Sequence, residues 1–208
     1  MNRKLLFLCG LFSPLVYIAM TVIGGAMRLD YSHIYHAVSE LLEVGAPNKF
    51  LMDILLTISD ILSLLFSIGV LLVVKESHQL RPTGMFGAYC LITVSILGLL
   101  TALFFPMDPR HDTLTFPGLM HLVIVSVLAI LSVLTPVILA IWLKKQTAYT
   151  RFGTFSYISA IVILVTGGLA AASAIVESPL MGLAERLTVI AYFQWTFFLA
   201  LKMYKTTQ

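Results

Sequence analysis

Six long apolar stretches, separated by short polar segments, constrain this sequence more than any other feature. They cover residues 5–27, 50–74, 85–105, 118–143, 152–176 and 182–202. About 20 apolar residues suffice for an α-helix to cross the hydrocarbon core of a bilayer. Pro106, Pro117 and Pro179 lie in the polar segments, where they favour helix ends. The pattern predicts an all-α, polytopic membrane protein with six transmembrane helices in one bundle.

Composition supports the same class of protein. Of the 208 residues, 59% are hydrophobic and 11% are charged, whereas soluble domains carry about 25% charged residues. Because the connections are short, we expect residues 1–208 to form a single domain. The two cysteines, Cys9 and Cys90, lie inside apolar stretches, so they predict neither a disulfide framework nor a Cys-based metal site. The net charge of +3 comes from the stretch ends and not from one patch, which favours membrane lipids over nucleic acid as partners.

Lys and Arg residues are divided unequally between the two sides of the predicted bundle. The side of the N-terminus holds nine of them: Arg3, Lys4, Lys75, Arg81, Lys144, Lys145, Arg151, Lys202 and Lys205. The other side holds four: Arg28, Lys49, Arg110 and Arg186. Basic segments tend to stay in the cytoplasm. We therefore expect a cytoplasmic (plasma) membrane protein with both termini cytoplasmic and its polar chemistry at the extracytoplasmic face.

The segment 31–47 (YSHIYHAVSELLEVGAP) concentrates polar residues between the first two apolar stretches. Apolar residues recur in it at helical spacing: Ile34, Ala37, Val38, Leu41 and Leu42. This spacing predicts a short interfacial helix over about 32–44 that lies on the membrane surface or folds into the mouth of the bundle. His33, His36 and Glu40 share the opposite face. Such spacing suits Zn²⁺, and it also occurs on solvated helices that bind no metal.

A second group of ionisable residues surrounds the fourth apolar stretch. Asp108 and His111 lie in the loop before it, and His121 lies just inside it. These residue types suit metal ligation and acid–base catalysis, so His36, His111 and His121 are candidate zinc ligands. The alternative for His121 is a headgroup-level histidine that bonds to a neighbour.

Glu185 and Arg186 begin the sixth apolar stretch. Adjacent residues point apart on a helix, so each needs a partner elsewhere in the bundle. Asp108 is a candidate partner for Arg186, and His121 is a candidate partner for Glu185.

Asp53 and Asp60 lie on one face of the second apolar stretch, together with Thr57, Ser63 and Ser67. Asp60 is ten residues in from Phe50, which is about 15 Å along a helix and close to the bilayer midplane. A carboxylate there must be protonated, paired or hydrated. The two acids therefore form either an intramembrane polar relay for protons or cations, or a hydrogen-bonded lock between helices.

The order of these motifs resembles the domain-of-unknown-function 998 family of six-helix prokaryotic membrane proteins, over nearly the whole chain. The motifs are Ser39-Glu40-Leu41, Phe105-Pro106-x-Asp108, His121 and Glu185-Arg186. The resemblance implies the six-helix fold and no particular activity. It favours as candidate catalytic residues the polar members of these motifs: Ser39, Glu40, Asp108, His121, Glu185 and Arg186.

A weaker similarity connects Ser39, Asp108 and His121 to the alkaline ceramidases and progestin/adiponectin-type receptors. Those are seven-helix intramembrane hydrolases with a zinc ion held by histidines, and the similarity implies a zinc-activated water that attacks an amide or ester. This sequence departs from their pattern because it has six apolar stretches and no His-x-x-x-His pair in the last one.

Three functions follow from these residues. The first is an intramembrane lipid hydrolase or transferase. The second is a small ion-coupled transporter that uses Asp60. The third is a non-catalytic membrane sensor or scaffold, which we expect if the outer carboxylates and histidines pair off with one another.

Overall fold

Six long helices make up the fold. The computed structural model describes residues 2–110 and 112–207, and there is no strand within these ranges. The helices are α1 (Arg3–Ala26), α2 (Lys49–Lys75), α3 (Arg81–Phe104), α4 (Phe116–Leu143), α5 (Thr150–Ile175) and α6 (Met181–Thr206). Two short 3₁₀ helices, η1 (Ser39–Leu41) and η2 (Thr147–Tyr149), lie in the connections. All six long helices are apolar enough to cross a membrane, which confirms the predicted fold class.

Local sequence explains where several helices begin and end. The Thr115 hydroxyl caps α4 by accepting a hydrogen bond from the Gly118 amide at 3.3 Å. Pro117 lies in the first turn of α4, where a missing N–H is tolerated because that group has no partner inside the helix. The Asn2 side chain caps α1 in the same way, accepting from the Lys4 amide at 3.0 Å. These boundaries place the loops that carry most of the polar side chains.

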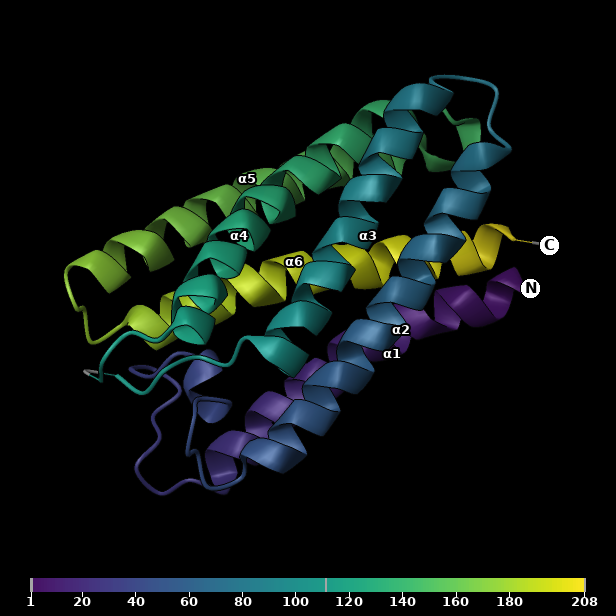
Figure 1. The fold of residues 1–208 in the computed structure, drawn as a ribbon. Helices are drawn as coiled ribbons and strands as arrows, with labels where there is room; N and C mark the ends of the chain where they lie inside the picture. Colours follow the sequence, from purple (N-terminus) through teal and green to yellow (C-terminus); the bar gives the residue numbers. More distant parts are fainter. Residues whose placement is uncertain (1, 111, 208) are drawn as a thin grey trace.

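The six helices form a ring in chain order (Figure 1). Each helix packs against the next one in the sequence, and α6 returns to pack against α1. Both chain termini lie at one end of the ring, which we call the terminal end. The opposite end carries the first loop (residues 27–48), the second loop (residues 105–115) and the short α5–α6 connection. We call this the polar end.

Two hydrophobic clusters fill the ring. The larger lies toward the terminal end and includes Phe66, Trp142 and Trp195. The smaller lies at the polar end, where residues of the first loop pack against Met20 of α1 and Met52 of α2; these loop residues are Val38, Leu41 and Leu42. The first loop is therefore folded into the mouth of the ring.

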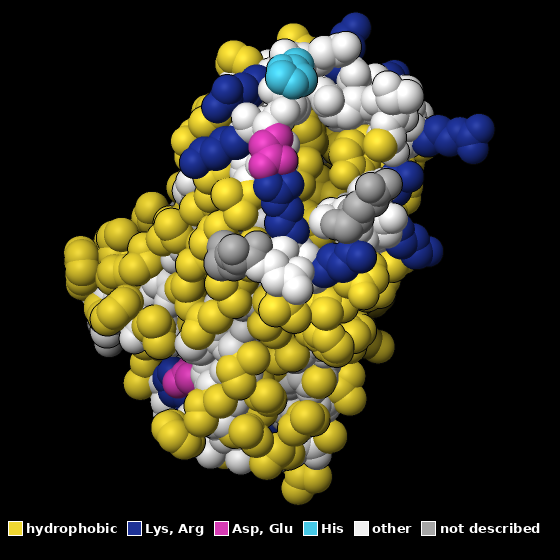
Figure 2. Space-filling view, turned by 90° about the vertical axis from the view of Figure 1, so that its right-hand side faces the viewer, with side chains coloured by type: hydrophobic (Ala, Val, Ile, Leu, Met, Phe, Trp, Pro, Cys, Tyr) yellow, Lys and Arg dark blue, Asp and Glu magenta, His cyan; other side chains and the backbone are white. Residues whose placement is uncertain are grey.

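Basic side chains gather at the terminal end. Lys75 ends α2, Arg81 begins α3 and Lys205 lies in the last turn of α6. Figure 2 faces this end and shows Lys and Arg side chains around it, above a largely hydrophobic surface. The Arg3 side chain forms an ion pair with Glu76, which follows α2, and this contact holds the pKa of the exposed Glu76 carboxyl below its ordinary value.

The expected interfacial helix over residues 32–44 is not confirmed, because the segment forms turns and the three-residue helix η1. In an α-helix the Val38 amide would donate to the Ile34 carbonyl. Instead Val38 N donates to Glu185 Oε2 at 3.0 Å, and the Ile34 carbonyl accepts from the Leu183 amide at 2.9 Å. Contacts with α6 therefore replace the local helical bonds. Ala37 and Val38 still point into the bundle, as the apolar pattern indicates, whereas Ile34 is exposed.

Candidate functional site

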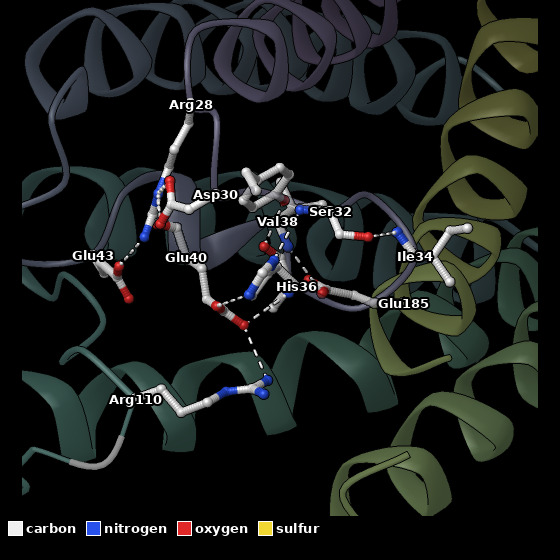
Figure 3. A network of polar contacts seen from close by, with 12 residues as sticks. Arg28, Asp30, Ser32, Ile34, His36, Val38, Glu40, Glu43, Arg110 and Glu185 are labelled. Atoms are coloured by element: carbon white, nitrogen blue, oxygen red, sulfur yellow. Dashed lines mark hydrogen bonds and ion pairs between the residues drawn. The ribbon is translucent and has the colours of Figure 1, made fainter. Parts of the chain in front are cut away.

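Glu40 lies at the centre of a polar network in the first loop (Figure 3). Its side chain is almost completely buried. Oε1 accepts from the Ala37 amide at 3.0 Å and from Arg110 Nη2 at 3.1 Å. His36 Nε2 lies 4.0 Å from Oε2. Because Arg110 comes from the second loop, Glu40 joins the two loops to each other.

Arg28 follows the end of α1 and fastens the other side of the first loop. Its Nη1 donates to the Glu40 carbonyl at 2.7 Å, and its Nη2 donates to Glu43 Oε1 at 3.0 Å. Its Nε lies 3.2 Å from an oxygen of Asp30. The Arg28 guanidinium holds the pKa of the exposed Asp30 carboxyl below its ordinary value. One arginine thus binds two carboxylates and a carbonyl of the same loop.

Arg186 binds the first loop from the second turn of α6. Its Nη1 donates to the His36 carbonyl at 2.7 Å and to the Gly182 carbonyl at 2.9 Å, and its Nη2 donates to the Tyr31 hydroxyl. The Tyr31 hydroxyl donates in turn to the Ala37 carbonyl at 2.7 Å. An added Cβ at Gly182 would collide with the His36 carbonyl. Glycine at this position therefore lets the loop approach α6 closely.

Asp108 and His121 hold the second loop onto α4. Asp108 accepts from the Thr115 amide at 2.7 Å and from the Thr115 hydroxyl at 2.8 Å. His121 Nδ1 lies 2.8 Å from the Phe105 carbonyl. Asp108 and His121 thus bond to groups of the second loop, whereas Arg186 and Glu185 bond to the first loop. The candidate pairs Asp108–Arg186 and His121–Glu185 are therefore wrong.

Ser39 is partly buried in η1. A serine nucleophile needs a base at about 2.6–3.2 Å. The hydrogen bonds of Glu40, Glu185 and His121 described above go to other groups and not to the Ser39 hydroxyl. The predicted catalytic residues thus fall into two separate sets, one around the first loop and one around the second.

Two of the three candidate zinc ligands, His36 and His121, lie within the described residues. His36 Nδ1 accepts from the Ser32 amide at 2.9 Å, and His121 bonds to its own loop. Within residues 2–110 and 112–207, no group of three His, Cys, Asp or Glu side chains is arranged to hold a metal ion. His111 lies outside the described residues, so zinc at His36, His111 and His121 stays a prediction.

The two acids of α2 have different surroundings. Asp53 pairs with Lys49 one turn earlier, at 2.6 Å. Asp60 lies against Gly98 of α3, where an added Cβ would be 2.7 Å from Asp60 Oδ1. Asp60 Oδ2 is buried and has no hydrogen-bond partner in the described chain. The serines of the same stripe, Ser63 and Ser67, bond to Ser95 of α3. A relay through Asp53 and Asp60 stays a prediction.

A groove of about 470 Å³ runs between α1 and α6, below the first loop. Its walls are mostly apolar, and half-exposed side chains such as Leu15 and Ile190 line it, so it opens on the outer surface of the ring. Its rim at the polar end includes His33 and Arg186. Burial, together with the nearby Arg186 guanidinium, lowers the pKa of the His33 imidazole.

Sequence reasoning missed this groove because its walls come from the first and last helices. No spacing rule connects residues so distant in the chain. The one available signal was the aromatic content of the last apolar stretch, where Phe193, Phe197 and Phe198 line the groove. Tyr17 of α1 packs against Phe193 with ring centroids 4.7 Å apart.

Comparison with known proteins identifies the family. The family model described as "Protein of unknown function (DUF998)" matches residues 11–202. The chain belongs to this family. No curated protein and no solved structure matches the chain significantly. The matched range reaches all six helices and both polar loops.

The polar end of this DUF998 protein holds its loops in place through carboxylates that are buried or partly buried. Glu40, Glu43 and Glu185 each accept hydrogen bonds from a loop amide or an arginine. Paired in this way, the three carboxylates stabilise one loop conformation. The groove below the loop has mostly apolar walls.

Proposed function

We propose that this DUF998 protein is a non-catalytic membrane protein that binds a lipid in the α1–α6 groove and acts as a sensor or scaffold. The observation that carries the proposal is an apolar groove on the outer surface of the ring, closed at the polar end by the first loop. Its volume of about 470 Å³ lies within the roughly 300–1,000 Å³ typical of ligand sites. A lipid chain is the apolar molecule that a membrane supplies at such a position.

The contacts of the polar side chains support a binding role over hydrolysis. An intramembrane hydrolase or transferase needs its nucleophile or activated water beside a base. Here Glu40 and Glu185 bond to the first loop, while Asp108 and His121 bond to the second. The same residues account well for a loop that is held rigidly above a bound lipid.

The unequal distribution of basic residues supports an orientation for this site. Lys75, Arg81 and Lys205 lie at the terminal end. Following the positive-inside rule, we propose that this end faces the cytoplasm. We accordingly propose that the groove takes its lipid from the extracytoplasmic leaflet of the cytoplasmic membrane.

Filling the groove tests the proposed function. Ile190 lines the groove and is half-exposed, so Ile190→Trp places a larger side chain where the lipid would lie. Ile161 of α5 is similarly exposed but lies outside the groove, which makes Ile161→Trp the matched control. Native mass spectrometry of protein purified in mild detergent should show fewer bound lipids for Ile190→Trp only. Equal lipid retention by both variants would contradict lipid binding in this groove.

A second candidate function, an ion-coupled carrier, is favoured by Asp60. Its buried Oδ2 has no partner in the described chain, and unpaired carboxylates inside membranes often serve proton or cation transfer. Proteoliposomes containing a pH-sensitive dye would then show proton uptake that Asp60→Asn abolishes. Asp53→Asn is the control, because Asp53 pairs with Lys49 near the start of α2. Absence of uptake by the unchanged protein would exclude proton coupling.

A further inference from the structure

The α1–α6 groove has a permanent positive charge at its rim. Arg186 lines the groove, and no Asp or Glu side chain is among the lining residues. Arg3, Arg28 and Arg110 each form an ion pair with a carboxylate. None of the ion pairs formed within residues 2–110 and 112–207 includes Arg186. No carboxylate of the described residues thus lies within ion-pair distance of Arg186.

The bonds of Arg186 orient its guanidinium and leave donors free. A guanidinium has five N–H groups, and the acceptors of Arg186 are two carbonyls and the Tyr31 hydroxyl. Its Nε is buried and has no partner in the described part of the chain. A buried donor without a partner is unfavourable and calls for a ligand or ion. All the acceptors are neutral, so they position the guanidinium without cancelling its charge.

The depth of Arg186 fits a lipid headgroup. Arg186 is five residues after Met181, the first residue of α6, which is about 7.5 Å along the helix axis. Headgroup regions are roughly 5–8 Å thick on each side of the hydrocarbon core. A headgroup beside Arg186 would thus be level with the rim of the groove, while its chain extends along the apolar walls.

We propose that the ligand of the groove is a phospholipid with a net negative headgroup, whose phosphate pairs with Arg186 while an acyl chain lies between α1 and α6. This inference rests on the proposed function and specifies its ligand. The planar guanidinium matches the geometry of phosphate oxygens. Because no carboxylate is among the described residues that line the groove, none of them would pair with the cationic group of a zwitterionic headgroup.

His33 supports the same chemistry from the other side of the rim. It lies against Gly25 of α1, where an added Cβ would collide with its ring. The imidazole lines the rim of the groove, where a ring N–H can donate one hydrogen bond to a phosphate oxygen. Arg186 then supplies the charge selectivity.

Lipid competition tests this inference on the full-length protein. Native mass spectrometry would compare phosphatidylglycerol with phosphatidylcholine carrying identical chains. One Arg near anionic lipid is worth about 1 kcal/mol, so we expect about 5-fold preference for phosphatidylglycerol. Arg186→Gln should reduce the preference to nearly 1-fold, and Arg186→Lys, which keeps the charge, should retain most of it. Equal binding of both lipids by the unchanged protein would overturn the inference without any variant.

Two further competition experiments test whether the bound anion is a phospholipid, a free phosphate or a fatty acid. Inorganic phosphate should not displace phosphatidylglycerol, because it lacks the acyl chain, and oleate should compete weakly. Displacement by either compound, at a concentration equal to that of the phospholipid, would overturn the proposal of a phospholipid ligand.

Ile190→Trp separates the failure of this inference from the failure of the proposed function. If this variant loses both lipids and the unchanged protein shows no headgroup preference, only the proposal of an anionic headgroup is overturned, and lipid binding in the groove stands. Undiminished binding of both lipids overturns the groove itself.

Discussion

At the scale of single residues, the polar end is held together by side chains that bind backbone groups. Glu40 accepts from the Ala37 amide, Glu185 accepts from the Val38 amide, and Arg186 donates to the His36 carbonyl. Each contact satisfies a backbone group that the irregular loop would otherwise bury without a partner. The rigidity of the first loop therefore depends on few side chains.

Removing the Glu40 carboxylate should destabilise the protein measurably. Glu40→Ala leaves the Ala37 amide and the Arg110 guanidinium without this acceptor, and an unsatisfied buried polar group costs about 1–3 kcal/mol. We expect thermal unfolding in mild detergent at a clearly lower temperature. The control Glu177→Ala changes an exposed residue after α5 and should shift stability by no more than about 0.5 kcal/mol. Equal effects of the two substitutions would contradict the role of Glu40.

His33 should make the first loop sensitive to pH. Its pKa lies below the ordinary value of 6.5 because the folded surroundings disfavour the protonated form. Above that pH the imidazole is neutral whether the loop is folded or not. Below it the unfolded form binds a proton first, so the stability of the folded loop decreases as the pH falls.

The measurement for His33 is the difference in melting temperature between the unchanged protein and His33→Gln. Between about pH 7.5 and about pH 5.5, the unchanged protein should lose more stability than the variant. A difference that stays constant, or changes in the opposite direction, would exclude His33 as the titrating group.

The sequence identified the chemistry of these residues but not their partners. Glu40, Glu185 and Arg186 were singled out as polar residues next to apolar stretches. Their partners are mostly amides and carbonyls of the first loop. Every residue carries such groups, so the side-chain pattern contains no information about which of them are free. For this reason the sequence led to the wrong pairs Asp108–Arg186 and His121–Glu185.

At the scale of elements, the helices of the ring approach one another closely at particular glycines. At Gly10 of α1, an added Cβ would lie 2.5 Å from the Phe66 ring and 2.7 Å from Ala200 Cβ. The contact therefore involves α1, α2 and α6 together. At Gly168 of α5, an added Cβ would meet no atom of the described residues within 4 Å. Gly10 thus lies in a tightly packed contact, whereas Gly168 has open space beside it.

Alanine at these two glycines should have opposite effects on stability. Gly10→Ala inserts a methyl group into a filled contact, and such overpacking typically costs about 1–3 kcal/mol. Gly168→Ala meets no neighbour and removes the flexibility of glycine, so it should be neutral or stabilise by up to about 1 kcal/mol. Thermal unfolding of both variants in one detergent checks this. A lower melting temperature for Gly168→Ala than for Gly10→Ala would contradict the packing described.

The first loop shows where periodicity fails as a guide to elements. Its apolar residues have helical spacing, and Val38, Leu41 and Leu42 are buried as that spacing indicates. The helix does not form over residues 32–44 because α6 binds the Val38 amide and the Ile34 carbonyl. The spacing of apolar residues therefore predicts which side chains of the loop are buried. It does not predict the hydrogen bonds of the loop backbone, because these depend on residues of α6.

At the scale of the whole molecule, six hydrophobic helices form a ring with different ends. The six-helix fold was predictable because helix length and apolarity are local properties of the sequence, and the structure confirms it. The closure of the ring by α1 and α6 was not, because packing between the first and last helices depends on surfaces distant in sequence. The groove is a consequence of this closure.

Cysteine labelling tests the proposed orientation of the ring. With Cys9 and Cys90 replaced by serine, single cysteines would be introduced as Thr113→Cys in the second loop and Thr207→Cys after α6. A membrane-impermeant maleimide should label Thr113→Cys in intact spheroplasts and Thr207→Cys only after permeabilisation. The reverse pattern would place the groove in the cytoplasmic leaflet.

Lipid binding between α1 and α6 is most directly measured by photo-crosslinking in the membrane. A phosphatidylglycerol with a diazirine near the middle of one acyl chain would be incorporated in vesicles with the purified protein, and the labelled peptides identified by mass spectrometry. We predict labelling concentrated on groove residues such as Ile18 and Ile190, and reduced there by Ile190→Trp. Labelling spread evenly over the lipid-facing surfaces of α4 and α5, with no excess in the groove, would contradict the proposed function.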